Sequence, residues 1–273
     1  MARPALDELL DTNRFEYAQF GVTCLRGLFD PAIIAALADA SRAVIERPLE
    51  HGGAGYMRGP MTAVNFVYRC PGVFRDFALA SPAGEIIGRV IGSRTIRMYH
   101  DYVFSKQPGC TKVVPWHTDG GGYALSGQMM PNLWVALTPT DETNGRLEFI
   151  GGFHVEFAAK RWSERRKSAD SIEQALPDFD DPDETFTKAC PRLAWNLDPG
   201  DAVLFHPYTP HHSKANRSGA TRTGYALRVV GDDVAWCLTK SRWLQIPGID
   251  YEAVTDGAPV TDDETFPVMW REA

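Results

Sequence analysis

The chain has 273 residues, 44% of them hydrophobic and 11% aromatic, and is long enough to bury one large core or two small ones. Its formal net charge of -7 argues against a nucleic-acid partner, because surfaces that bind nucleic acid are normally basic. No apolar leader is recognisable and no run of about 18 apolar residues occurs, so we expect a cytoplasmic protein without a membrane partner.

Glycine and proline are distributed as turn residues rather than gathered in a linker, and no internal repeat is visible. We therefore expect residues 1–273 to form one domain. The five cysteines are scattered without a Cys-x-x-Cys pair, which indicates reduced thiols rather than a disulfide framework or a zinc ribbon.

The N-terminal part, about residues 1–95, has the pattern of helices. The segment FDPAIIAALADASRAVIER places Asp30 as an N-cap and Pro31 at the first helical position, followed by apolar residues at helical spacing. A second helical stretch is predicted from Phe74 to Val90.

From about residue 96 the hydrophobic period changes to that of strands. Five segments are short, rich in β-branched and aromatic residues, and bounded by Gly, Pro or Asn. They are Ile96–Ser105, Asn132–Thr138, Arg146–Gly151, Asp201–His206 and Thr223–Val230. Because short strands separated by turns are typical of sandwiches and barrels, we predict a mainly β protein with flanking helices. Its core, about residues 96–240, is expected to be a double-stranded β-helix, a cupin-like jelly roll.

Two connections in this core have their own signals. Asn144-Gly145 suits a tight hairpin turn, because both residues tolerate positive φ. The charged stretch of about residues 155–197 contains KRWSERRK and DFDDPDE, and we interpret it as an insertion or lid.

A histidine and an aspartate lie two positions apart in VVPWHTDGGGY. In an extended strand, residues two apart point to the same side, so His117 and Asp119 can reach one metal together. An imidazole and a carboxylate are borderline and hard ligands that suit iron(II), although the pair alone is a weak signal.

A distant histidine would complete a facial triad of two histidines and one carboxylate, which leaves three coordination positions for a chelating cosubstrate and oxygen. Three candidates follow a predicted strand in FHPYTPHHSKANRS, namely His206, His211 and His212. Local spacing alone does not choose among them.

Arg222, in the following GATRTGY, is a candidate anion anchor. A dicarboxylate that chelates a metal through its 2-oxo acid end leaves its far carboxylate about one strand spacing away, where a guanidinium can pair with it. Ser213 lies on the same face as His211 if that stretch is extended, and its hydroxyl can donate to the same carboxylate. Arg228 shares the strand face of Arg222 but lies six residues, roughly 20 Å, further along, which we interpret as too far.

At this point the chain resembles the phytanoyl-CoA dioxygenase family of iron(II)- and 2-oxoglutarate-dependent oxygenases. The resemblance spans nearly the whole chain and depends on the order of modest motifs. They are EYAQFGVTCLRGLFDPAIIAAL, IRMYHDYVFSKQPG, VPWHTDGGGY, LWVALTPTDETNGRLEFIGGFH and GDAVLFHPYTPHHSKANRSGATR.

The resemblance implies a role for each matching position. It identifies His117, Asp119 and His211 as the iron ligands. It implies that Arg222 and Ser213 hold the 2-oxoglutarate C5 carboxylate. Three further residues would surround the cosubstrate: Tyr102, Thr118 and Trp134. The chain departs from the family at His212, where glycine is common, and at the glycine run 120–122, where bulkier residues are usual.

The implied activity is a dioxygenase that uses iron(II), 2-oxoglutarate and O2 to hydroxylate an unactivated C–H bond of a small molecule, with release of succinate and CO2. Asp119 favours hydroxylation over halogenation, because halogenating relatives lack this carboxylate. Desaturation and ring formation are neighbouring reactions, and the motifs specify neither the substrate nor the oligomeric state. Two alternatives from other classes are a zinc-dependent hydrolase on the same ligands and a non-catalytic jelly-roll binding protein.

Overall fold

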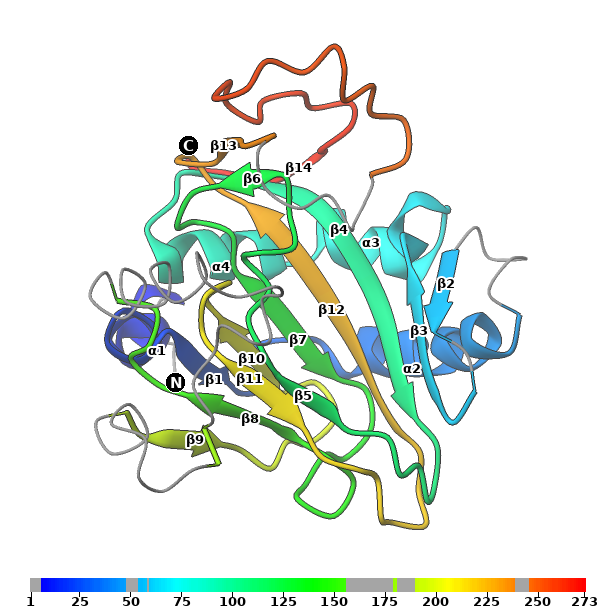
Figure 1. Cartoon of the computed structure of the whole chain (residues 1–273). Coiled ribbons are helices and arrows are strands. Elements are labelled where there is room, and N and C mark those ends of the chain that lie inside the picture. Colours follow the sequence, from blue (N-terminus) through cyan, green and yellow to red (C-terminus); the bar gives the residue numbers. More distant parts are fainter. Residues whose placement is uncertain (1–5, 48–53, 58, 156–178, 181–189, 239–245) are drawn as a thin grey trace.

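Two antiparallel sheets face each other, and helices from the N-terminal part cover the outer side of the larger sheet (Figure 1). The computed structural model describes residues 6–47, 54–57, 59–155, 179–180, 190–238 and 246–273. This jelly-roll arrangement confirms the predicted fold class, a mainly β protein with flanking helices.

The larger sheet has eight strands, which come from both the first and the last parts of the chain. In spatial order they are β1 (Val22–Leu25), β10 (Ala202–Phe205), β7 (Asn132–Ala136), β12 (Arg222–Val230), β4 (Thr95–Lys106), β3 (Met61–Asn65) and β2 (Ala54–Met57), with β14 (Val268–Arg271) paired to β4.

The smaller sheet has four strands and lies across the inner face of the larger one (Figure 1). Its spatial order is β5 (Val114–His117), β11 (His211–Ser213), β8 (Leu147–Ile150) and β9 (Arg192–Ala194), so β5 is an edge strand. A separate two-stranded ladder joins β6 (Leu125–Ser126) to β13 (Ala235–Trp236).

In the described part of the chain, four α-helices pack on the outer side of the larger sheet and form the main hydrophobic core with it. They are α1 (Leu6–Phe20), α2 (Pro31–Glu46), α3 (Val73–Ala80) and α4 (Ala83–Ile91), and a 3-10 turn, η2 (Val67–Arg69), precedes α3. The predicted start of α2 is confirmed, because the Asp30 carboxylate accepts a hydrogen bond from the Ala32 amide and Pro31 opens the helix. No helix of the described ranges is long and apolar enough to cross a membrane.

Two expectations for the N-terminal part are corrected. The stretch from Phe74 to Val90 is two helices rather than one, because Pro82 lacks the amide hydrogen that would continue α3. The first 95 residues are also not purely helical, since β1, β2 and β3 join the larger sheet. The strand β1 begins directly after Gly21, whose φ of 70° belongs to the left-handed region.

The Asn144-Gly145 turn does not close the predicted hairpin. The strand before it, β7, pairs with β10 and β12, whereas β8 after it pairs with β11 and β9. The turn therefore carries the chain from one sheet to the other. Only Gly145 has positive φ; Asn144 instead donates from its side-chain amide to the Pro139 carbonyl. Most of the predicted lid, residues 156–178 and 181–189, lies outside the described residues.

Strand register brings the predicted site residues onto the inner faces of the two sheets. In the larger sheet Arg222 is opposite Lys106, and Arg228 is opposite both His100 and Asn132. Because directly paired residues point to the same side of a sheet, these side chains face the smaller sheet. The smaller sheet contributes His117 and His211, which are direct cross-strand partners.

Candidate active site

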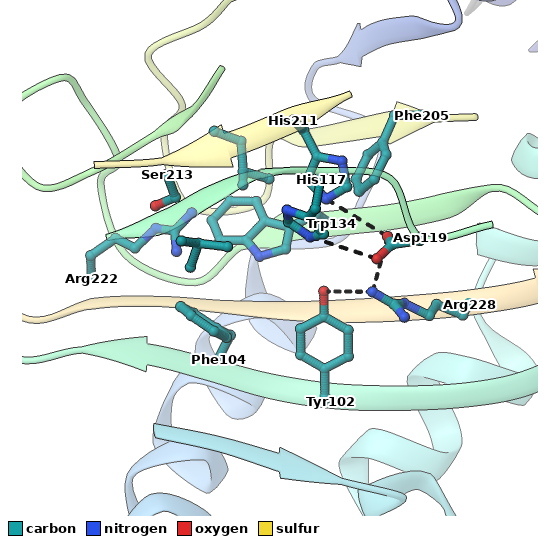
Figure 2. Close-up of a pocket in the computed structure, with 12 residues that line it drawn as sticks. Tyr102, Phe104, His117, Asp119, Trp134, Phe205, His211, Ser213, Arg222 and Arg228 are labelled. Carbon is teal, nitrogen blue, oxygen red and sulfur yellow. Dashed lines mark hydrogen bonds and ion pairs between the residues drawn. The ribbon is translucent and has the colours of Figure 1, made fainter. Parts of the chain in front are cut away.

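The three predicted metal ligands converge between the two sheets (Figure 2). His117 ends β5, Asp119 follows it by two positions, and His211 begins β11. The Nε2 atoms of the two histidines are each 3.7 Å from an oxygen of Asp119. Ligand atoms about 2.1 Å from one metal and at right angles to each other lie about 3 Å apart, so a small inward movement would complete the site. Two imidazoles and one carboxylate are a donor set that fits iron(II).

The backbone fixes which nitrogen of each histidine is available to a metal. The Nδ1 atom of His117 is 2.9 Å from the Pro115 carbonyl, and that of His211 is 3.1 Å from the Thr209 carbonyl. A carbonyl oxygen can only accept, so each Nδ1 carries the proton and each Nε2 keeps a free lone pair. Such contacts hold metal-binding imidazoles in orientation.

Burial and nearby charges keep His211 and Asp119 in the protonation states that a metal requires. Burial lowers the pKa of His211 to about 4, so its imidazole is neutral at physiological pH. Burial alone would raise the pKa of Asp119, but the Arg228 guanidinium and the two imidazoles hold it below its usual value. The site therefore presents an anionic Asp119 carboxylate and a neutral His211 imidazole, which is the state in which these side chains bind a metal.

The rival histidines point elsewhere. His212 stacks on Trp116 with ring centres 3.9 Å apart, and its Nε2 atom is 3.1 Å from Glu148. His206 belongs to no metal-binding cluster among the described residues. The geometry thus favours His211, the position that the family resemblance also identified.

Arg222 is the predicted anion anchor, and its guanidinium is buried in the same cavity as the triad. The side chain is 1% exposed, and its Nε and Nη2 atoms have no hydrogen-bond partner among the described residues. Burial lowers the pKa of Arg222 to about 10, so it still carries a positive charge at neutral pH. A buried cation with unused donors requires an anion, and none is supplied by the described part of the chain.

Trp134 lies beneath this guanidinium, with its ring centre 4.3 Å from the central carbon. The ring occupies the space above Gly224, where a Cβ atom would come within 1.9 Å of it. The glycine on β12 therefore allows the tryptophan of β7 to lie flat across the neighbouring strand. In the sequence Gly224 lies two positions after Arg222 on the same strand, but the reason for a glycine there is visible only from the pairing of β12 with β7.

A cavity of about 160 Å³ joins the triad to Arg222. Besides the charged residues and Ser213, its walls are aromatic or aliphatic: Tyr102, Phe104, Val114, Trp134, Leu147 and Phe205. Tyr102 and Trp134, which are predicted to surround the cosubstrate, thus line the cavity. Thr118 does not line it, and its buried hydroxyl has no hydrogen-bond partner among the described residues.

Ser213 lines the cavity, but its hydroxyl donates to the Gly145 carbonyl, 2.6 Å away. The oxygen of that hydroxyl accepts a hydrogen bond from Lys106, whose ammonium also donates to the backbone carbonyls of Ser213 and Lys214. Lys106 is fully buried and joins the two sheets at the Arg222 end. Sequence reasoning missed it, although a lysine alternating with Tyr102 and Phe104 on a strand was a usable signal.

Arg228 is a second residue whose role sequence reasoning did not identify. It lines the same cavity as Arg222, at the opposite end, where its Nη2 atom is 3.0 Å from Asp119 (Figure 2). The spacing of six residues along the strand indicates that Arg222 and Arg228 are too far apart to hold the same carboxylate. The cavity, however, runs parallel to β12 and receives both arginines.

The two departures from the family pattern have structural reasons. A Cβ atom at Gly120 would lie 2.4 Å from the Tyr208 ring, so a bulkier residue does not fit there without displacing that ring. His212 fills the outer face of the smaller sheet between Trp116 and Glu148. Neither residue changes the ligand set.

Comparison with known proteins gives a family match and a fold match. The family model described as "Phytanoyl-CoA dioxygenase (PhyH)" matches residues 17–224. A phytanoyl-CoA dioxygenase of Arabidopsis thaliana is 26% identical over 174 residues, which are 63% of this chain and 57% of that protein. A 2-aminoethylphosphonate dioxygenase of the uncultured bacterium HF130_AEPn_1 is 28% identical over 166 residues, which are 58% of this chain and 54% of that protein. The match thus spans little more than half the length of these relatives.

Among solved structures, the non-heme alpha-ketoglutarate-dependent carbocyclase SnoK from nogalamycin biosynthesis has a similar fold. The TM-score is 0.77 with 20% sequence identity, and the alignment covers 98% of this chain and 100% of that one. At this identity the likeness supports the fold alone.

Proposed function

Because the chain belongs to the phytanoyl-CoA dioxygenase (PhyH) family, we propose that it is an iron(II)- and 2-oxoglutarate-dependent dioxygenase. We propose further that it hydroxylates an unactivated C–H bond of a small molecule and releases succinate and CO2. His117, Asp119 and His211 would hold the iron, and Arg222 would hold the far carboxylate of 2-oxoglutarate.

One observation carries this proposal, namely the buried Arg222 in the same cavity as the triad, whose Nε and Nη2 atoms have no hydrogen-bond partner among the described residues. A metal site alone is equally compatible with zinc hydrolysis. Such a hydrolase would have no use for a buried guanidinium, whereas a dicarboxylate that chelates the metal needs a cation at its far end. Paired through two charge-assisted hydrogen bonds, the carboxylate would satisfy the donors that the described residues leave unused.

The triad and the residues that line the cavity would have different roles in this reaction. The triad occupies three coordination positions on one side and leaves the others for cosubstrate and oxygen. Iron(II) and 2-oxoglutarate, when bound, would supply the oxidation of the C–H bond coupled to decarboxylation. Trp134 supports the Arg222 guanidinium, while the apolar walls formed by Leu147 and Phe205 exclude water from the cosubstrate.

The substrate is proposed to be a small molecule, with neither nucleic acid nor a membrane as partner. The net charge of -7 argues against a nucleic-acid partner, because surfaces that bind nucleic acid are normally basic. Hydroxylation is preferred over halogenation because Asp119 keeps its carboxylate within reach of both histidines. Named relatives act on different compounds, so the PhyH fold by itself selects no substrate.

The first test of the proposal measures the binding of iron(II) and 2-oxoglutarate, before any substrate turnover. Metal-free protein is loaded anaerobically with iron(II) and titrated with 2-oxoglutarate, and a weak visible charge-transfer band is expected to appear. Zinc-loaded protein and succinate are the controls, and neither should give the band. Absence of the band at saturating iron, or full substrate turnover with zinc alone, would contradict the assignment.

A further inference from the structure

The two oxygens of Asp119 have unequal surroundings. The Oδ2 atom accepts hydrogen bonds from the Asn132 side-chain amide at 2.6 Å and lies 3.0 Å from Nη2 of Arg228. For Oδ1, the nearest polar contact given by the described residues is His117 Nε2 at 3.7 Å. A carboxylate oxygen has about two lone-pair sites, so both sites of Oδ2 are used and those of Oδ1 are available.

Arg228 is held firmly in this position. Its guanidinium lies over the rings of Tyr102 and Tyr123, at 5.0 and 5.3 Å from their centres. It also donates hydrogen bonds to both tyrosine hydroxyls. The side chains of Arg228 and Asp119 are 7% and 5% exposed, so the ion pair is shielded from solvent. Its contacts differ from those of Arg222, whose Nε and Nη2 atoms have no hydrogen-bond partner in the described part of the chain.

We propose that Arg228, assisted by Asn132, restricts Asp119 to metal binding through a single oxygen. This inference rests on the proposed function. Iron has six coordination positions, of which the triad takes three only if Asp119 binds through one atom. A carboxylate bound through both oxygens would take a fourth, and a chelating 2-oxo acid together with oxygen would no longer fit. Arg228 is therefore a positioning residue that keeps three coordination positions of the metal available to the cosubstrate and oxygen.

The inference makes metal binding and cosubstrate binding respond differently to substitution. Without Arg228, Oδ2 loses its cationic partner and becomes available to the metal. Metal affinity should then be kept or increased, because a competing positive charge has been removed and a second donor oxygen added. Affinity of the metal-loaded protein for 2-oxoglutarate should fall, because one of its coordination positions is taken.

The test uses the full chain with Mn(II), which replaces iron(II) without oxygen chemistry. Metal-free Arg228→Met protein is titrated with Mn(II) by calorimetry, and the loaded protein is then titrated with 2-oxoglutarate. Methionine keeps apolar contact with the two tyrosines, and Arg228→Lys keeps a cation and serves as the matched control. We expect Mn(II) affinity to be retained or increased in Arg228→Met, and 2-oxoglutarate affinity to fall by at least about 10-fold. In Arg228→Lys, the affinity for 2-oxoglutarate should fall less.

Asn132→Ala provides a second variant if Arg228→Met does not fold, because it removes the other donor to Oδ2 and leaves the tyrosine contacts intact. It should weaken 2-oxoglutarate binding in the same direction without loss of Mn(II) affinity. A parallel loss of Mn(II) affinity in either variant would overturn the inference and make Arg228 a simple support for Asp119. Unchanged 2-oxoglutarate affinity in both would also overturn it. Failure of the metal-loaded wild-type protein to bind 2-oxoglutarate would instead count against the proposed function.

Discussion

The central carbon of the Arg222 guanidinium lies 4.3 Å from the centre of the Trp134 ring, so the candidate anion anchor rests on an aromatic face. Gly224 makes this contact possible, because any side chain there would occupy the place of the ring. Gly224→Ala should therefore displace Trp134 and weaken 2-oxoglutarate binding, by up to roughly 30-fold if the full value of a desolvated cation–π contact, about 2 kcal/mol, is lost. Titration of metal-loaded protein measures the change, and Trp134→Phe, which keeps a ring, should lose less. Unaltered binding in Gly224→Ala would contradict the role given to the ring.

Removing the anchor itself should have a larger effect. Truncating one partner of a buried charge pair costs about 2 to 5 kcal/mol, so Arg222→Ala should raise the 2-oxoglutarate requirement by roughly 30-fold or more. Arg222→Lys should recover only part of the affinity, because an ammonium cannot form the two parallel bonds of a guanidinium. The dependence of oxygen consumption on 2-oxoglutarate concentration gives the result. Mn(II) affinity is the control and should not change, since Arg222 contacts no ligand of the triad among the contacts described.

Loss of the carboxylate ligand should abolish the reaction rather than weaken it. Substitutions beside a metal ligand cost about 10- to 100-fold, so Asp119→Ala should reduce hydroxylated product by more than about 100-fold even when the protein is replete with iron. Asp119→Glu should recover little, because a displacement of about 1 Å can cost on the order of 100-fold in a positioned site. Product is measured per bound iron, with iron content determined separately. Near-normal product from iron-replete Asp119→Ala protein would remove Asp119 from the ligand set.

The helix side of the larger sheet contains a separate titratable group. Burial raises the pKa of Asp101 to about 7, while Tyr225 and the Tyr68 amide donate to its Oδ2 atom. Between about pH 4 and pH 7 the unfolded chain has lost this proton and the folded chain still holds it. Stability should therefore fall as pH rises through that window and lose the whole contribution above it. Thermal melts of Asp101→Asn should show a smaller fall over the same range; an identical pH dependence in both proteins would exclude Asp101 as the cause.

The parts of the site that local pattern could predict are those that are close in sequence or at the start of a clear strand. His117 and Asp119 are two apart, although β5 ends at His117 and Asp119 lies in the loop after it. Arg222 begins a strand that is rich in β-branched and aromatic residues. Local sequence alone did not select His211 over His206 and His212, because the choice depends on which face of β11 meets β5. That pairing joins residues far apart in sequence, and only the family resemblance supplied it in advance.

The parts that could not be predicted depend on pairing between distant strands. The segment Val22–Leu25 is too short to signal a strand by itself, and it becomes one because it pairs with β10. The role of Arg228 could not be read from strand spacing, because its partner Asp119 comes from a loop beside a different sheet. Lys106 likewise finds its acceptors on β11 and just beyond it.

Because β5 is an edge strand, a bound metal would affect the stability of the sheet as well as the chemistry of the site. Among the described strands, β5 pairs only with β11, and its last residue, His117, is paired there with His211. A metal bound by both imidazoles would fasten the two strands together at that pair, and ligands that bind only the folded state stabilise what they join. The amides of β5 and β11 should therefore exchange their hydrogens with solvent more slowly once metal is present. In the metal-free protein, opening of this edge would separate the two imidazoles.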